Sequence, residues 1–159
     1  MKSAWQRLIL DIVLLAGMIA VALHKVTGDV VHEWLSVFLI PLLILHLLWN
    51  WEVIWGTGKQ LKNPRFPWRQ KFNFIWNILL YTCMGVVMLS GILISRDFLP
   101  RLGILIANDP FMSYIHKRSI FVLYMMLGIH LGMHWNWIWQ MGKRLGKGQK
   151  SNKNERKEP

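Results

Sequence analysis

The sequence predicts an all-α integral membrane protein, a single bundle of four transmembrane helices with both termini in the cytoplasm. Of the 159 residues, 53% are hydrophobic, and they gather in four long blocks in which Asp11 is the one ionised side chain. Each block, with its flanks, reaches the roughly 20 residues that a helix needs to cross a bilayer. Such spans must be helical, because lipid offers backbone groups no hydrogen-bond partner. The blocks are residues 8–23, 34–49, 74–94 and 119–133.

Turn-forming residues predict where the helices end. Gly28 follows the first helix, and Gly56 and Gly58 follow the second, in which Pro41 predicts a kink. Residues 96–113 are predicted to form an outer loop with a short interfacial piece. The predicted helices cover about residues 4–25, 31–55, 71–95 and 113–141, within one domain of residues 1–142.

The basic residues predict the orientation. A formal charge of +11 could suggest a nucleic-acid partner, but Lys and Arg gather at helix ends, 14 on one side of the bilayer and 5 on the other. Cytoplasmic loops carry this excess in multi-pass membrane proteins. We therefore expect the N-terminus, the loop 56–71 and the tail 143–159 to be cytoplasmic. The tail is polar and basic, and we expect it to be disordered.

The first apolar block also has features of a cleavable signal peptide. Lys2 and Arg7 precede it, and the small residues Ala20-Val21-Ala22 could form a cleavage site. However, Asp11 interrupts the apolar stretch, which continues to Leu23. We expect this segment to be retained as the first span.

Four histidines form two pairs with the same spacing. His32 and His46 are 14 residues apart in the second predicted helix, and His116 and His130 are 14 apart in the fourth. Fourteen residues are nearly four helical turns, so each pair shares a helix face with about 21 Å between its members. Both helices run from outside to inside in the predicted topology. His32 and His116 therefore lie at an outer level, and His46 and His130 at an inner one.

Two imidazoles at one level can take both axial positions of a haem iron, a ligand set suited to electron transfer. Buried polar side chains in a membrane are functional candidates, although one histidine alone could simply bond to a backbone carbonyl. Two matched pairs favour two haems. Cys83 is the single cysteine and no CxxCH motif occurs, so the haems are expected to be noncovalent b-type groups. The second-choice ligands are His134 at the inner level and His24 at the outer level.

Other polar and small residues have two interpretations each. Asp11 follows Arg7 by one helical turn, which favours an ion pair over a proton-handling role. Asn73, Asn77 and Tyr81 form a stripe that could contact a quinone head group or hydrogen-bond to another helix. Two further sets are candidates. The basic residues Arg96, Lys117 and Arg118 lie near the expected haem propionates. The small residues Gly85, Ser90 and Gly91 could let a flat macrocycle or a neighbouring helix approach the backbone.

These motifs together resemble the flavinylation-associated cytochrome family, small four-helix membrane proteins of prokaryotes. The similarity covers about residues 5–141. It includes Thr27-Gly28, His32-Glu33-Trp34-Leu35, His46 with Asn50, Ser90-Gly91 before Ser95-Arg96, His116, and His130-Leu131-Gly132-Met133-His134-Trp135. Ser36 departs from the pattern, where typical members have glycine. The resemblance implies a b-type cytochrome of the cytoplasmic membrane that passes electrons to an extracytoplasmic protein carrying flavin. Quinol or a cytoplasmic donor would supply them, and no flavin is expected on this chain.

Three functions therefore remain open at the level of sequence. The first is a transmembrane electron conduit. The second is a cytochrome b anchor of a quinone-linked dehydrogenase, hydrogenase or reductase. The third belongs to another class, a metal transporter or scaffold with metal-binding histidines. The spans offer only one carboxylate, Asp11, and this disfavours transport.

Overall fold

The computed structural model describes residues 4–106 and 109–155, and all the secondary structure in this part of the chain is helical. This confirms the predicted all-α class. The helices are α1 Ala4–Ala22, α2 His24–Thr27, α3 Asp29–Trp49, α4 Trp51–Gln60, α5 Trp68–Leu93, α6 Phe98–Arg101 and α7 Pro110–Glu155.

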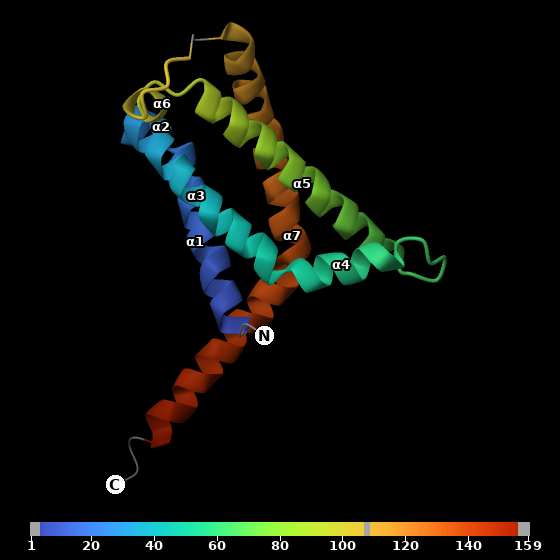
Figure 1. The fold of residues 1–159 in the computed structure, drawn as a ribbon. Coiled ribbons are helices and arrows are strands. Elements are labelled where there is room, and N and C mark those ends of the chain that lie inside the picture. The colour runs from blue at the N-terminus through green and yellow to red at the C-terminus, as the bar shows by residue number, and fades with distance from the viewer. Residues whose placement is uncertain (1–3, 107–108, 156–159) are drawn as a thin grey trace.

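The long helices pack as two pairs, α1 with α3 and α5 with α7 (Figure 1). The short helix α2 and Gly28 reverse the chain between α1 and α3. Gly28 has a φ of 87°, in the left-handed region that favours glycine. In the second pair, α5 crosses α7, and the indole of Trp76 in α5 donates a hydrogen bond of 3.3 Å to the carbonyl of Met126 in α7.

One buried apolar cluster joins the two pairs at mid-height. Its two least exposed members are Leu39 in α3 and Leu123 in α7, each with 2% of its surface exposed. Leu39 lies midway between His32 and His46 in the sequence, and Leu123 lies midway between His116 and His130. The core therefore lies between the two histidine levels. Its full membership is Leu10, Leu14, Met18, Leu39, Leu80, Met84 and Leu123.

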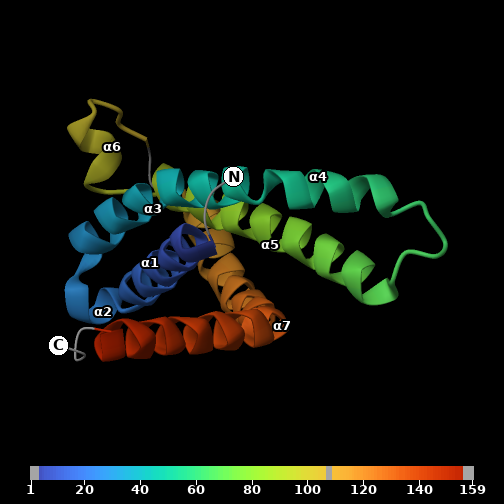
Figure 2. The same ribbon diagram turned by 90° about the horizontal axis from the view of Figure 1, so that it is seen from below.

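The second predicted helix ends earlier than expected and continues as a separate helix. α3 stops at Trp49, and the Asn50 side chain donates a hydrogen bond of 2.8 Å to the carbonyl of His46. α4 then continues from the end of α3 and runs beside α5 (Figure 2). Its Trp51 and Trp55 rings stack at 6.3 Å and are both exposed. Exposed indoles with a nearby lysine suit a helix that lies at a membrane surface.

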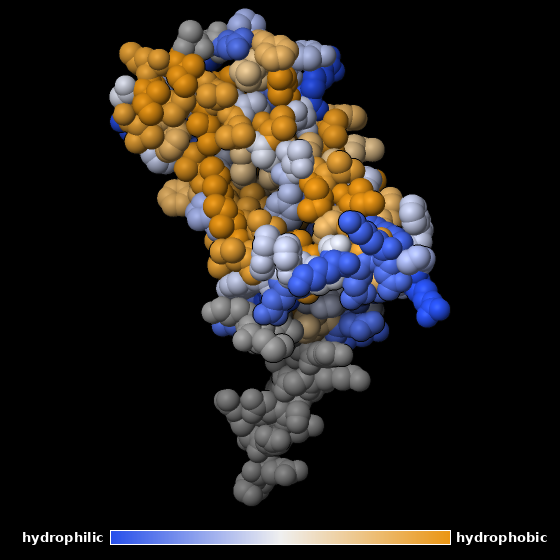
Figure 3. All heavy atoms as spheres, turned by 45° about the vertical axis from the view of Figure 1, so that its right-hand side comes forward, coloured by the Kyte–Doolittle hydropathy of each residue, from blue (hydrophilic) through white to orange (hydrophobic). Residues whose placement is uncertain are grey.

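Large apolar side chains cover much of the outside of the molecule. Figure 3 shows them over the body of one face, with hydrophilic residues gathered mainly toward its lower end. Exposed apolar area of this extent is typical of a membrane protein. Examples from the four long helices are Ile12, Phe38, Leu89 and Phe121.

Within the described residues, three helices are long and apolar enough to cross a membrane, against four predicted. They are Trp5–Ala22, Asp29–Trp49 and Trp68–Leu93. The fourth predicted span lies in α7, which contains His116, His130 and His134. The remaining helix boundaries agree with prediction to within a few residues, except at the end of α7. It continues to Glu155, past the expected end at 141 and into the segment expected to be disordered. A helix that is already formed can be extended without a new nucleation step.

Candidate functional site

His32 in α3 and His116 in α7 come together at the end of the bundle where α2 and α6 lie. Their ring centroids are 6.5 Å apart, with the ring planes at 82°. Two imidazoles that bind one metal ion from opposite sides, with metal–nitrogen distances of about 2 Å, place their centroids roughly 6 Å apart. This separation is close to the one that two imidazoles would need in order to hold one iron between them.

Each of these rings is oriented by a backbone carbonyl on a neighbouring helix. The His32 Nδ1 lies 2.9 Å from the carbonyl oxygen of Val21 in α1, and the His116 Nδ1 lies 2.9 Å from that of Val87 in α5. A carbonyl only accepts, so in both rings Nδ1 carries the proton and Nε2 keeps a free lone pair. Metal-binding histidines commonly have this arrangement.

Ser90 and Gly91 form the surface on which the His116 ring rests. The Ser90 Oγ lies 3.2 Å from the His116 Nδ1 and donates its own proton to the Val86 carbonyl. A Cβ atom on Gly91 would lie 2.8 Å from the Cε1 of His116, closer than packing allows. The sequence suggested that Gly91 allows a close approach, and the structure identifies the approaching group as an imidazole.

At the other end of the bundle, His46 in α3 faces Asp11 in α1. The Asp11 Oδ1 and the His46 Nδ1 are 2.8 Å apart, although they are not aligned as a hydrogen bond. The expected ion pair between Asp11 and Arg7 is wrong. The Arg7 side chain instead donates to the Asn50 Oδ1 at 3.4 Å, because the α1–α3 packing turns the carboxylate toward His46.

His130 in α7 is oriented by Asn77 in α5. The His130 Nδ1 lies 3.0 Å from the Asn77 Oδ1, so Asn77 makes the hydrogen bond between helices that was one of its two expected roles. The ring centroid of His134 lies 4.7 Å from that of His130. Asn73, one turn before Asn77, has a buried Oδ1 with no hydrogen-bond partner in the described part of the chain.

Three of the four first-choice histidines, His32, His116 and His130, therefore share one arrangement, in which Nδ1 is hydrogen-bonded to an oxygen on another helix and Nε2 is left free for a metal. The His46 Nδ1 lies beside the Asp11 carboxylate without being aligned for a hydrogen bond. Within residues 4–106 and 109–155, neither His24 nor His134 has such an acceptor. The His24 ring lies beside the His32 ring, with centroids 5.6 Å apart. The donor set fits haem iron, which binds imidazole nitrogen. No group of three or more His, Cys, Asp or Glu in those same ranges is arranged to hold a bare metal ion.

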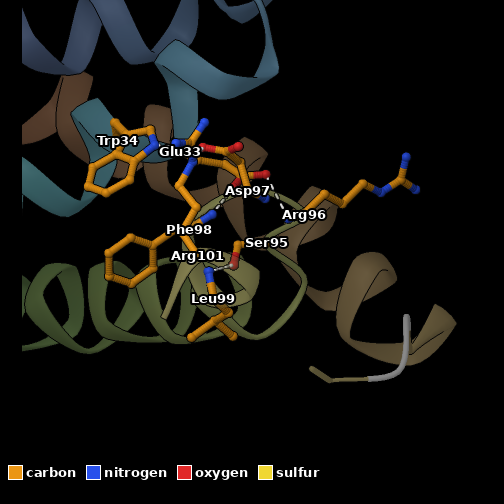
Figure 4. Close-up of polar contacts among 8 residues, drawn as sticks. All are labelled: Glu33, Trp34, Ser95, Arg96, Asp97, Phe98, Leu99 and Arg101. Atoms are coloured by element: carbon orange, nitrogen blue, oxygen red, sulfur yellow. Dashed lines mark hydrogen bonds and ion pairs between the residues drawn. The ribbon is translucent and has the colours of Figure 1, made fainter. Parts of the chain in front are cut away.

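A network of polar contacts fixes the turn after α5 beside the His32 end of the bundle (Figure 4). The Glu33 carboxylate accepts hydrogen bonds of 2.9, 2.9 and 3.0 Å from the backbone N–H groups of residues 96–98. The Asp97 carboxylate accepts from the Arg101 side chain at 2.8 Å and from the Trp34 indole at 2.7 Å. Both bonds lower the pKa of Asp97, and the bond from Arg101 has the larger effect.

Sequence reasoning did not find most of these orienting residues. Glu33 and Trp34 appeared only as part of a motif, and Asp97 was not singled out. A carboxylate directly after a candidate ligand in His32-Glu33 is the signal that was available. The partner of that carboxylate lies more than sixty positions away, so no local pattern reveals it.

An all-helical chain with an apolar surface, and with histidines whose Nε2 atoms are free to bind iron, has the features of a membrane b-type cytochrome. A family model described as prokaryotic cytochrome b561 matches residues 5–141, and the chain belongs to this family. The family binds haem b and carries electrons across the membrane. No curated protein and no solved structure is detectably similar to the chain.

Proposed function

We propose that this protein carries electrons across the cytoplasmic membrane through two noncovalent b-type haems. His32 and His116 hold the outer haem, and His46 and His130 hold the inner one. The single observation that carries the proposal is that each Nδ1 lies 2.8–3.0 Å from an oxygen on another helix. The oxygens belong to Val21, Val87, Asp11 and Asn77 respectively, and three of the contacts, all but that of Asp11, are hydrogen bonds.

The residues of the chain bind and orient the cofactors, and haem, when bound, supplies one-electron redox chemistry. Two imidazoles per iron leave no coordination position for a substrate, and this favours electron transfer over catalysis at the metal. Leu39 and Leu123, each 2% exposed, belong to the apolar core between the two levels. A transporter or scaffold with metal-binding histidines would not need this two-level arrangement.

The inner level is the better candidate for the electron donor. Under the proposed topology it lies toward the cytoplasm, where quinol or a cytoplasmic protein could supply electrons. The buried Oδ1 of Asn73, which has no hydrogen-bond partner among the described residues, supports a polar head group binding beside α5 at this level. The acceptor is proposed to be an extracytoplasmic redox partner, a flavin-carrying protein by the resemblance noted above. The alternative is a membrane anchor for a quinone-linked dehydrogenase, hydrogenase or reductase.

Haem content and redox spectra of the purified full-length protein test the proposal. The expected result is two extractable haems per chain and a reduced-minus-oxidised spectrum of low-spin b-type haem. His46→Ala and His130→Ala are each expected to lose one haem, and to lose the same one. His32→Ala and His116→Ala are expected to lose the other.

His24→Ala and His134→Ala serve as matched controls, because each removes an imidazole next to a proposed ligand. Both variants are expected to keep two haems. Loss of a haem from His134→Ala, with both haems kept by His130→Ala, would reassign the inner ligand. A wild-type protein without haem would refute the proposal and favour the transporter or scaffold.

A further inference from the structure

Asp11 is the one ionised side chain within the four apolar blocks, and it lies beside a proposed haem ligand. Its Oδ1 is 2.8 Å from the His46 Nδ1, and neither atom has a hydrogen-bond partner in the described residues. The Asp11 side chain is 33% exposed and the His46 side chain 24%, so both are largely buried within the protein. A carboxylate inside a membrane span is unfavourable unless it has a partner, and such residues commonly serve a function.

The other three proposed ligands face uncharged acceptors. The acceptors are the carbonyls of Val21 and Val87 for the outer pair and the amide oxygen of Asn77 for His130. The two levels thus differ in charge, because in the described part of the chain only the inner level has a carboxylate against a ligand ring. The nearest competing explanation, an ion pair with Arg7, does not apply, because the Arg7 guanidinium bonds to Asn50.

We propose that Asp11 positions the His46 ring and holds the inner haem at a lower reduction potential than the outer haem. This inference rests on the proposed function, because it requires haem at His46. When an imidazole binds a metal through Nε2, a carboxylate at its Nδ1 makes the ligand more basic and fixes its orientation. Its negative charge also stabilises the more positive, oxidised iron. The equilibrium between the levels then favours an electron on the outer haem, and this gives the conduit an outward direction.

Optical redox titration of Asp11→Asn tests the inference, because this change removes the charge and keeps an oxygen acceptor of similar shape. The variant is expected to keep two haems. The haem with the lower reduction potential is identified as the one missing from His46→Ala. Its reduction potential is expected to rise in Asp11→Asn. The equilibrium constant for its reduction is expected to increase about tenfold, which corresponds to about 59 mV for one electron. The other component is expected to stay unchanged.

Two further variants separate charge from general disturbance. Asp29→Asn removes a carboxylate from an exposed position at the start of α3 and is expected to shift neither potential. Asn77→Asp adds a carboxylate against the other inner ligand and is expected to lower the same component further. If Asp11→Asn loses the inner haem, Asp11→Glu, which keeps the negative charge, is the test variant. An inner haem that Asp11→Glu retains at the low reduction potential supports the inference, and an inner haem with a raised potential overturns it.

The outcomes distinguish this inference from the proposed function. Two haems with unchanged potentials in Asp11→Asn would overturn the role of Asp11 and leave the conduit intact. The same holds if the low-potential component proves to be the outer haem. A wild-type chain without haem, or a His46→Ala variant that keeps both haems, would refute the proposed function itself.

Discussion

At the scale of single residues, the position of His116 depends on a neighbour that has no side chain. The imidazole lies directly over Gly91 in α5, where an added Cβ would come within 2.8 Å of its Cε1 atom. The backbone around Gly91 cannot yield easily, because it belongs to a long helix. The ring itself would have to move, and its hydrogen bond to the Val87 carbonyl would be lost.

We therefore expect Gly91→Ala to bind one haem per chain in place of two, with the inner haem retained. Gly85→Ala is the matched control, since a Cβ at that position of the same helix meets no atom within 4 Å. In the control, the better helix propensity of alanine should add up to about 1 kcal/mol of stability. Haem extraction and the difference spectrum measure the effect. Two haems in Gly91→Ala would show that the outer ligand lies elsewhere.

At this scale the sequence selects candidate ligands but does not reveal the residues that orient them. Equal spacing within one helix selects His32, His46, His116 and His130, because spacing along a helix determines which residues share a face. That assignment stays a prediction. The contact of Asp11 with His46 depends on how α1 is rotated against α3, which sequence spacing does not specify. The predicted Asp11–Arg7 ion pair was based on sequence spacing alone, and it is wrong.

At the scale of elements, the chain shows why helix limits are harder to predict than helix existence. The apolar blocks locate α1, α3 and α5 correctly, because the length and hydropathy of a span are properties of the local sequence. The break at Asn50 depends on a side chain that caps its own helix, and the glycines expected to end that helix instead lie inside α4. The short helix α6 forms at Phe98–Arg101, beside the apolar stretch expected to be interfacial.

The turn between α5 and α6 should respond to acid through Asp97. Hydrogen bonds from Arg101 and Trp34 lower the pKa of Asp97 in the folded protein below that of an unfolded aspartate, which is about 3.9. A carboxyl group whose pKa is lower in the folded than in the unfolded protein stabilises the fold at pH values above its unfolded pKa. This stabilisation is lost as the pH falls through the pKa of the folded protein. We therefore expect Asp97→Asn to lower the thermal unfolding temperature at pH 6 and to have less effect at pH 3. An equal loss at both pH values would contradict an ionic role for Asp97.

The packing of α1 against α3 depends on Gly17. A Cβ there would lie 2.5 Å from the Cδ2 of Leu39, and Leu39 is 2% exposed and has little room to move. We expect Gly17→Ala to destabilise the detergent-solubilised protein by about 1–3 kcal/mol, as overpacking does in other cores. Gly132→Ala provides the comparison, since a Cβ at that exposed glycine of α7 meets nothing within 4 Å. Thermal unfolding of both variants measures the difference, and equal stabilities would contradict the packing argument.

At the scale of the whole molecule, the number of spans depends on α7. This helix is not among the three that qualify by length and hydropathy, although it packs along α5. Its polarity comes partly from His116, His130 and His134, and the proposed function requires two of these to face the bundle interior. The proposed function thus requires α7 to cross the membrane although its mean hydropathy is lower than that of the other three long helices. A span that binds cofactors is less apolar than one that only contacts lipid.

The proposed topology predicts which parts of the chain are accessible from each side. The native Cys83 is the only cysteine, so a Cys83→Ser background permits single cysteines to be added. We expect Arg96→Cys to react with a membrane-impermeant maleimide in intact cells with a permeabilised outer envelope. Lys62→Cys should react only after the inner membrane is disrupted, because the proposed topology places the basic loop before α5 in the cytoplasm. A reporter joined to the C-terminus should be active in the cytoplasm, which requires α7 to cross back. A C-terminal reporter active outside, with Arg96→Cys also labelled from outside, would leave α7 at the membrane surface and could not place His116 and His130 at two depths.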